Sequence, residues 1–135
     1  MKGIADTGFI VAFLNRRDRH HAWARQIALA VSTPLLTCEA VLAEAVWHLR
    51  VAIPVFGLIH TGLLRIGFTA ADHLEHLEAF AIRYRDIQPD FADLCLVRMS
   101  ELHRHHAVIT TDERDFRIYR RQRDQIIPVH TPFSL

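Results

Sequence analysis

The sequence has few of the residues that mark secreted, fibrous or membrane proteins. Only two cysteines, five glycines and five prolines occur among 135 residues, so neither a disulfide framework nor a low-complexity chain is indicated. No apolar run reaches the roughly 18 residues that a membrane span needs, and the N-terminus lacks the pattern of a signal peptide. We therefore expect a cytoplasmic protein without membrane contact, in which Cys38 and Cys95 are small buried hydrophobic residues.

An excess of charge of one sign is also missing. The formal net charge is +1, which does not by itself mark a nucleic-acid-binding protein. The basic residues are clustered, however, in NRRDRHH (15–21), ELHRHH (101–106) and FRIYRRQR (116–123). These clusters can hold phosphate groups or form solvated surface, and the sequence alone leaves both interpretations open.

The composition that remains is that of a globular protein. Half of the residues are apolar and 23% are charged, which excludes an intrinsically disordered chain. A length of 135 residues suffices for one domain with its own core. Because the sequence contains no repeat and no flexible linker, we expect residues 1–135 to form a single domain.

Short apolar segments alternate with helical patterns along the chain. The expected strands cover residues 2–5, 34–38, 65–69, 107–110 and 125–129. The expected helices cover residues 7–15, 21–31, 39–50, 55–64, 70–85 and 91–106. Strands joined through helices form right-handed crossovers, so we predict an α/β fold, a three-layer α/β/α sandwich with a mainly parallel sheet of four to five strands.

Two aspartates follow expected strands directly. Asp6 follows the first strand, and Asp112 follows the segment AVIT (107–110). In parallel α/β sheets, ligands bind at the carboxyl ends of the strands. Each aspartate, taken singly, is better explained as the N-cap of the helix that follows it, because Asp is a favoured residue at a helix start.

Glu44 is harder to explain as a structural residue. It lies in the middle of EAVLAEAVWHL (39–49), which is apolar nearly all round and is therefore expected to be a buried helix. A buried carboxylate is costly unless it meets a cation or hydrogen-bond donors. Glu39, in the first turn, simply complements the helix dipole, so we interpret Glu39 as structural and Glu44 as functional.

Asp90 and Asp93 form the motif PDFADL ahead of another apolar helix. An N-cap with a partner three residues later explains Asp90 well. It explains Asp93 less well, because the neighbours of Asp93 are apolar and it should partly face inward. Separate caps account for three of the four regions and leave Glu44 unexplained, whereas a shared Mg²⁺ or Mn²⁺ ion accounts for all four.

Four blocks of this sequence resemble the PIN-domain family, and within it the VapC-type toxins of type II toxin–antitoxin pairs. The blocks occur in the family's order, and they are IADTGFIVAFLNRRDRHHAWA (4–24), LLTCEAVLAEAVWHL (35–49), PDFADLCLVRMSE (89–101) and VITTDERDFRIYR (108–120). The family's four catalytic acids fall on Asp6, Glu44, Asp93 and Asp112. Its accessory positions fall on Thr7, Thr111, Asp90 and Asp115. Leu94 stands where many relatives have alanine, which could narrow the site slightly.

The resemblance implies a Mg²⁺- or Mn²⁺-dependent endoribonuclease. Asp6, Asp93 and Asp112 would bind the metal ion, which activates a water molecule for attack on the phosphate, and Glu44 or Asp112 would take the proton from that water. The implied products are a 5′-phosphate and a 3′-hydroxyl. Six arginines become candidates for RNA contacts, with solvated surface as the alternative: Arg16, Arg17, Arg19, Arg117, Arg120 and Arg121.

The resemblance also implies partners. A cognate antitoxin would cover the acidic pocket with a segment that carries an arginine or lysine, and the toxin would form a homodimer. The alternative enzyme is a housekeeping PIN-domain nuclease that matures RNA without an antitoxin. A metal-binding receiver-like signalling domain is a further alternative, but it needs a lysine late in the chain and this chain has only Lys2.

Other residues point less clearly to a site. The histidines of HRHH (103–106) invite a zinc interpretation, but neither cysteine has a suitable spacing for a four-ligand site. Trp23 and Trp47 could stack on bases. Both lie in apolar helical segments, so we expect them in the core.

Overall fold

The fold is that of a computed structural model, which describes residues 1–133. Within these residues the central sheet has five strands in the order β3-β2-β1-β4-β7. The strands are β1 (Gly3–Ala5), β2 (Leu35–Thr37), β3 (Leu64–Ile66), β4 (Ala107–Ile109) and β7 (Val129–His130). All neighbouring pairs are parallel, which confirms the predicted fold class.

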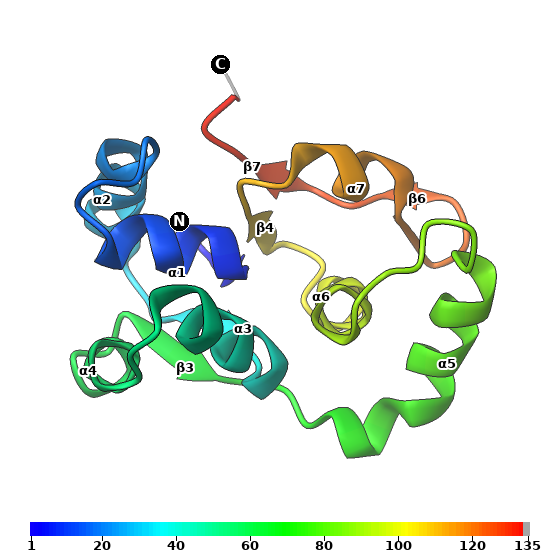
Figure 1. Cartoon of the computed structure of the whole chain (residues 1–135). Coiled ribbons are helices and arrows are strands. Elements are labelled where there is room, and N and C mark those ends of the chain that lie inside the picture. Colours follow the sequence, from blue (N-terminus) through cyan, green and yellow to red (C-terminus); the bar gives the residue numbers. More distant parts are fainter. Residues whose placement is uncertain (134–135) are drawn as a thin grey trace.

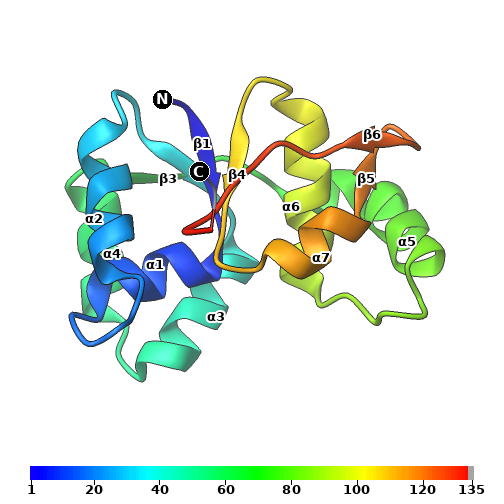
Figure 2. The ribbon, with the colours of Figure 1, turned by 90° about the horizontal axis from the view of Figure 1, so that it is seen from above.

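Helices cover both faces of this sheet, as Figures 1 and 2 show. One side carries α1 (Thr7–Leu14), α2 (His21–Ala30), α3 (Glu39–Leu49) and α4 (Ile53–His60). The other side carries the 3-10 helix η1 (Ala70–His73), α5 (Leu74–Arg83), α6 (Phe91–Leu102) and α7 (Glu113–Ile118). Right-handed crossovers explain the division, because the chain crosses the sheet in one direction from β1 through β2 to β3 and in the opposite direction from β3 through β4 to β7.

The direction of the chain across the sheet reverses between β1 and β4. Ile4 pairs with Leu36 of β2 on one side and with Val108 of β4 on the other. In open α/β sheets such a switch point opens a crevice at the carboxyl ends of the two strands. Asp6 and Asp112 therefore leave the sheet at the same edge, as the sequence predicts.

The C-terminal third differs from the prediction. Residues 125–129 do not form one strand. Instead β6 (Gln125–Ile126) pairs antiparallel with β5 (Arg120–Arg121), and β7 joins the main sheet. Pro128 lies between the two segments and has no backbone N–H to continue a strand ladder. The helix expected over 91–106 also ends early, at Leu102.

Helix α3 is not buried on all sides, which corrects the expectation from its composition. Only Val41 and Ala45 are buried in it. Trp47 was expected in the core, but 64% of it is exposed and the Arg50 guanidinium lies 4.1 Å from its ring centroid. Trp23 does pack partly buried against the core, edge-on to Phe9.

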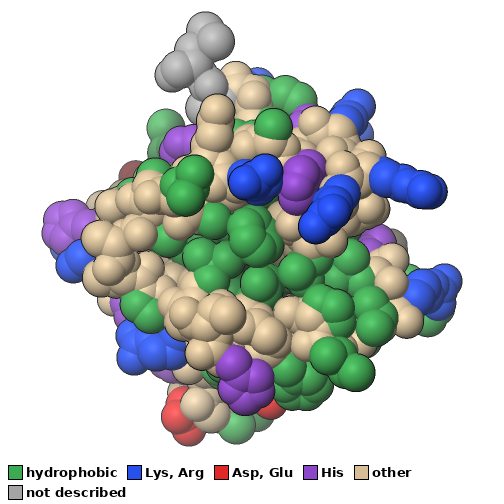
Figure 3. Space-filling model, turned by 90° about the vertical axis from the view of Figure 1, so that its left-hand side faces the viewer, with side chains coloured by type: hydrophobic (Ala, Val, Ile, Leu, Met, Phe, Trp, Pro, Cys, Tyr) green, Lys and Arg blue, Asp and Glu red, His purple; other side chains and the backbone are tan. Residues whose placement is uncertain are grey.

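Exposed apolar side chains gather on the side of the molecule where α2 and α4 lie, as Figure 3 shows. Leu29 of α2 and Ile53 and Phe56 of α4 are among the most exposed large apolar residues of the structure. Among residues 1–133, no helix combines the length and apolar character that crossing a membrane requires. The apolar surface is therefore presented by short helices packed on the sheet.

Candidate functional site

A cavity of about 320 Å³ opens at the carboxyl ends of β1 and β4. Its lining includes all four acids that the sequence singled out, and these come from four separate segments. The predicted accessory residues Thr7, Thr111 and Asp90 also line it. Further lining residues that the sequence did not indicate are Gly8, Val11, Asp18, His20 and His48.

Asp6 is both a helix cap and a cavity residue. It is the N-cap of α1, and its Oδ1 accepts a 2.6 Å hydrogen bond from the Thr7 N–H. Its Oδ2 accepts a second 2.6 Å bond from the Thr110 hydroxyl. Burial raises the pKa of Asp6 to about 6, and the nearby carboxylates of Glu44 and Asp112 add to the rise while both hydrogen bonds oppose it.

Thr110 connects the two strand-end aspartates. Its hydroxyl donates to Asp6 and accepts a 2.8 Å hydrogen bond from the Asp112 N–H. The sequence prediction named Thr111 instead and missed Thr110. The position of Thr110 directly after a strand could have indicated it, because β4 ends at Ile109 and side chains at strand ends face the site.

Thr111 has a different place in the site. It lines the cavity beside Gly8 of α1, so closely that a Cβ on Gly8 would lie 2.0 Å from the Thr111 hydroxyl oxygen. The helix start can approach the β4 loop this closely because residue 8 has no side chain. Gly8 therefore sets how near α1 comes to Asp112.

Glu44 reaches the cavity from α3. It is half-buried, and its Oε1 accepts a 2.9 Å hydrogen bond from the Thr7 hydroxyl. Burial raises the pKa of Glu44, and the charge of Asp90 raises it further, while the Thr7 bond and the His48 side chain act in the opposite direction. The residue lies in the cavity as predicted, although α3 is less buried than its sequence indicated.

Asp93 is held from two directions at the start of α6. Its backbone N–H donates to Oδ1 of Asp90 at 2.8 Å, which confirms Asp90 as the N-cap. Its Oδ2 accepts a 2.8 Å hydrogen bond from the buried Tyr119 hydroxyl. Burial raises the pKa of Asp93 to about 8, with contributions from the charges of three other aspartates. No sequence pattern indicates Tyr119, because it meets Asp93 only in the folded chain.

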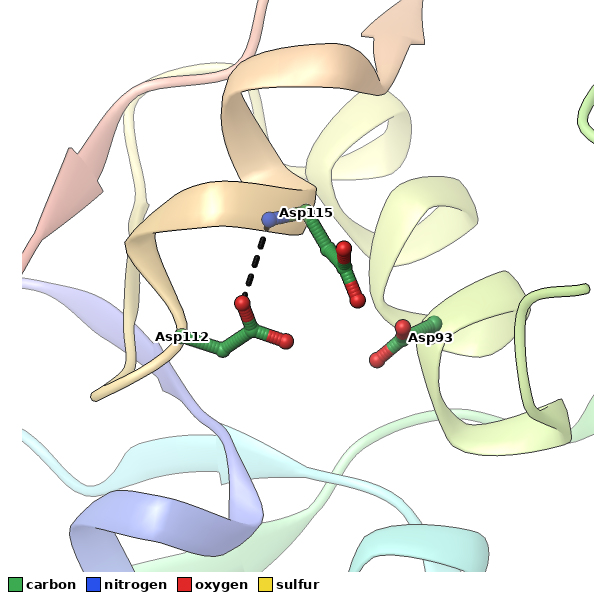
Figure 4. A group of neighbouring side chains, drawn as sticks. All are labelled: Asp93, Asp112 and Asp115. Carbon is green, nitrogen blue, oxygen red and sulfur yellow. Dashed lines mark hydrogen bonds between the residues drawn. The ribbon is translucent and has the colours of Figure 1, made fainter. Parts of the chain in front are cut away.

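Asp112 and Asp115 stand at the start of α7. Asp112 is the N-cap, and its Oδ1 accepts a 3.1 Å hydrogen bond from the Asp115 N–H. Figure 4 shows both side chains directed toward Asp93 across the gap between α7 and α6. One carboxylate oxygen from each of these three aspartates lies within 4.8 Å of the other two. Burial and the charge of Asp112 raise the pKa of Asp115.

These carboxylates fit a hard divalent cation. Their oxygens are the ligands that Mg²⁺ and Mn²⁺ prefer. Burial, and to a smaller extent the neighbouring carboxylates, raises the pKa values of Asp6 and Asp93, and the ion pairs found among residues 1–133 involve neither of them. The predicted metal ligands were Asp6, Asp93 and Asp112. In the structure Asp115 joins Asp93 and Asp112 in the tightest group, and Asp6 lies in the adjoining part of the cavity.

The six candidate arginines fall into two groups. Arg16, Arg17 and Arg19 are exposed in the loop between α1 and α2, which also contributes His20 to the acidic cavity. The other three belong to the α7–β5 region. Of these, Arg117 forms an ion pair with Glu113.

Arg121 differs most from its predicted role. It is buried, and its guanidinium donates to the carbonyl oxygens of Ser100 at 2.7 Å and Arg104 at 3.1 Å. Arg120 similarly donates to carbonyl oxygens at the end of α7, including that of Tyr119 at 3.0 Å. These contacts satisfy carbonyl groups at helix ends, which favours a structural role for both residues over phosphate contacts.

Comparison with known proteins gives a family match and a structural match. The model of the PIN domain family matches residues 4–122. The crystal structure of VapC20 from Mycobacterium tuberculosis, described as a sarcin–ricin loop cleaving toxin, superimposes with a TM-score of 0.70 at 20% sequence identity, covering 84% of this chain and 92% of that one. No curated protein matches the sequence.

Proposed function

The chain belongs to the PIN-domain family, and from this premise we propose that it is a Mg²⁺- or Mn²⁺-dependent endoribonuclease. One observation carries the proposal. Asp6, Glu44, Asp93 and Asp112 come from four separate segments and line one cavity at the switch point of the sheet. Capping accounts for only two of them, Asp6 and Asp112, and gives no reason for the convergence of all four.

Asp93, Asp112 and Asp115 would hold the metal ion, with Asp6 beside them. When bound, Mg²⁺ or Mn²⁺ polarises the scissile phosphate and lowers the pKa of a water molecule that attacks it. Among the chain's own residues, Thr110 fixes the orientation of Asp6, and Tyr119 fixes that of Asp93. Such hydrogen bonds hold ligand carboxylates in place before the ion arrives.

Glu44 or Asp112 would accept the proton of the attacking water. Glu44 is suited to this because Oε1 is engaged by Thr7, which fixes the carboxylate, and because its pKa is raised. A carboxylate with a raised pKa is a stronger base than an exposed one.

Cleavage would leave a 5′-phosphate and a 3′-hydroxyl. The exposed Arg16, Arg17 and Arg19 would contact RNA phosphates beside the cavity.

We further propose that the enzyme is the toxin of a toxin–antitoxin pair. The likeness to the VapC20 fold supports this. An antitoxin segment carrying an arginine or lysine would enter the acidic cavity, where its charge would pair with carboxylates that lack an ion pair in the structure of residues 1–133. The exposed apolar face of α2 and α4 would form a homodimer interface.

Cleavage of a pool of structured RNAs tests the nuclease proposal. The wild-type protein with Mn²⁺ or Mg²⁺ should cleave, and EDTA should abolish cleavage. The variant Asp6→Asn should lose roughly 100-fold or more of the rate, because a metal-site charge is removed while a side chain of the same shape remains. Asp72→Asn is the matched control, since Asp72 is an exposed aspartate in η1 outside the cavity.

Equal cleavage by the wild type and Asp6→Asn, or cleavage that survives EDTA, would contradict the mechanism.

Expression in a bacterial host separates a toxin from a housekeeping nuclease. A toxin should arrest growth, and Asp6→Asn or Glu44→Gln should relieve the arrest. Cleavage in vitro without any growth arrest would favour the housekeeping alternative.

A further inference from the structure

A second cavity, of about 470 Å³, adjoins the acidic one. The two cavities share Thr111 and Asp112, so they meet where the chain leaves β4 and enters α7. Its volume falls within the roughly 300–1,000 Å³ of ligand sites. The other residues that line it belong to α7 and to the chain after β7, and they are Glu113, Arg114, Arg117, Ile118 and Phe133.

Phe133 presents an aromatic ring at the boundary between the two cavities. Figure 2 shows the chain after β7 returning to the connection between β4 and α7, where Phe133 lines the second cavity. The side chain is 50% exposed, and its ring stands edge-on to that of His20 with the centroids 5.4 Å apart. His20 itself lines the acidic cavity. The Phe133 N–H donates to the Thr131 hydroxyl at 3.2 Å. An exposed aromatic ring held in this way is a surface on which a nucleic-acid base can stack.

The second cavity also contains a cation that is not engaged by a carboxylate. Arg117 forms an ion pair with Glu113. Arg114 is exposed and takes part in neither of the ion pairs found among residues 1–133. A guanidinium group binds phosphate, and an aromatic ring stacks on a base. Arg114 and Phe133 therefore match the two parts of a nucleotide.

We propose that this cavity is a subsite for the nucleotide next to the cleaved bond, whose base stacks on Phe133 while its phosphate contacts Arg114. The subsite rests on the proposed nuclease function, because its occupant is the substrate itself. Asp112 lines both cavities, so an RNA strand whose scissile phosphate lies among the carboxylates brings its neighbouring nucleotide to the second cavity. Bases within a double helix are already stacked on one another. The subsite therefore selects RNA that is unpaired beside the cleaved bond, as in loops and bulges.

Fluorescence of a labelled RNA tests the stacking without cleavage, with Ca²⁺ in place of Mg²⁺. Single-stranded oligoribonucleotides carry a fluorescent adenine analogue at successive positions, and stacking on an aromatic ring quenches it. With the wild type, one position should be quenched more strongly than its neighbours. Phe133→Leu should abolish this difference and weaken RNA binding roughly tenfold. Phe133→Trp is the matched control, because it retains a ring and should preserve both properties.

The salt dependence of RNA binding tests the phosphate contact. Arg114→Gln should weaken the binding of all single-stranded RNAs alike and reduce the slope of log affinity against log salt concentration by about 0.7, the value for one phosphate of a single strand. Arg85→Gln is the control, since Arg85 is exposed in the turn after α5, outside both cavities. It should leave the slope unchanged. Equal slopes for the wild type and Arg114→Gln would overturn the contact.

The subsite would be overturned by quenching that persists in Phe133→Leu, or by a loss of quenching in Phe133→Trp as well as in Phe133→Leu when all three proteins have the same melting temperature. Cleavage gives a further check. The wild type should cut RNA at least tenfold more slowly when the quenched position is paired in a duplex, and Phe133→Leu should narrow this ratio. An unchanged ratio would contradict the selection of unpaired RNA. Quenching that depends on Phe133 without any cleavage in Mg²⁺ or Mn²⁺ would refute the nuclease proposal alone.

Discussion

Asp6 combines two demands on a single side chain. It caps α1 through Oδ1 and receives the Thr110 hydroxyl through Oδ2. Both hydrogen bonds favour the charged form, yet the pKa is raised to about 6 because burial outweighs them. An aspartate that served only as a cap would stand exposed at the helix start with its charge hydrated. Burial raises the pKa of Asp6 more than the two hydrogen bonds lower it, which is what we expect of a carboxylate whose partner is a metal ion.

Protons and metal ions should compete for the acidic cavity. The pKa values of Asp6, about 6, and Asp93, about 8, lie above the value near 4 of an unfolded aspartate. The folded, metal-free protein therefore binds these protons more tightly than the unfolded chain does. Its free energy of unfolding should fall as pH rises from about 4 through 8.

The affinity for Mn²⁺ should change in the opposite sense and increase from pH 6 to pH 8, since the ion must displace the proton of Asp93. Calorimetric titration and the metal-induced shift in melting temperature at both pH values provide the measurements. Asp93→Asn should bind more weakly and lose most of the pH dependence. An affinity that is equal at pH 6 and pH 8 would contradict the pKa assigned to Asp93.

Tyr119 should act as a positioning residue for Asp93. Its hydroxyl donates to Asp93 Oδ2 at 2.8 Å, and this bond lowers the pKa of Asp93 against the effect of burial. Tyr119→Phe should raise that pKa further, weaken Mn²⁺ binding at pH 7 by roughly 10-fold, and move the cleavage profile toward higher pH.

Tyr84→Phe is the control for this change, because the Tyr84 hydroxyl bonds only to backbone atoms of Arg120 among the contacts of the described chain. It should leave the pH profile unmoved. A profile that shifts equally in both variants would indicate a general loss of packing around the two rings rather than positioning of Asp93.

At the scale of elements, the close approach of α1 to the β4 loop depends on Gly8. A Cβ there would lie 2.0 Å from the Thr111 hydroxyl oxygen. Gly8→Ala should therefore force α1 or the loop to move and lower the free energy of unfolding by about 1–3 kcal/mol. Cleavage should fall as well, because Asp6 and Asp112 flank the contact.

Gly57→Ala in α4 provides a control of opposite sign. No atom lies within 4 Å of a Cβ at Gly57, so the alanine should stabilise the helix by about 0.5–1 kcal/mol. Chemical denaturation of the two variants measures both effects. Stabilisation by Gly8→Ala would show that α1 does not need this close approach.

Helix ends also organise the site. Asp6, Asp90 and Asp112 are the N-caps of α1, α6 and α7, and all three helices begin at the same cavity. Their N-terminal dipoles partly offset the crowding of negative charge. The cap and site interpretations of these aspartates are therefore compatible rather than alternatives.

At the scale of the whole molecule, the exposed apolar side of α2 and α4 should form the homodimer interface. Phe56 and Ile53 are 60% and 79% exposed. Neighbouring apolar side chains exposed on one face mark a protein–protein interaction site. Sedimentation of the wild type should give a dimer at micromolar concentration, and Phe56→Arg should give a monomer. Ile126→Arg is the control, since Ile126 is 72% exposed in β6, in the hairpin that packs against α6, far from α2 and α4 (Figure 1). A monomeric wild type would contradict this assignment.

The sequence by itself determined the alternation of strands and helices, the parallel sheet, and the convergence of Asp6 and Asp112 at one edge. These features follow from periodicity, caps and the handedness of crossovers, which are local or nearly universal. The sequence also singled out Glu44 as a functional residue, and Glu44 does line the cavity. The reason was a helix expected to be buried on all sides, and the exposure of Trp47 shows that this expectation is wrong.

Only the tertiary structure decided which distant side chains meet. Tyr119 reaches Asp93, Thr110 links Asp6 to Asp112, and Arg121 turns inward to the end of α6. None of these pairs has a local sequence signal, because each joins segments that approach only when α6 and the β4–β7 segment pack against the sheet. Local patterns fix where an element starts and which face it buries, whereas the partner of each buried polar group is set by packing between elements.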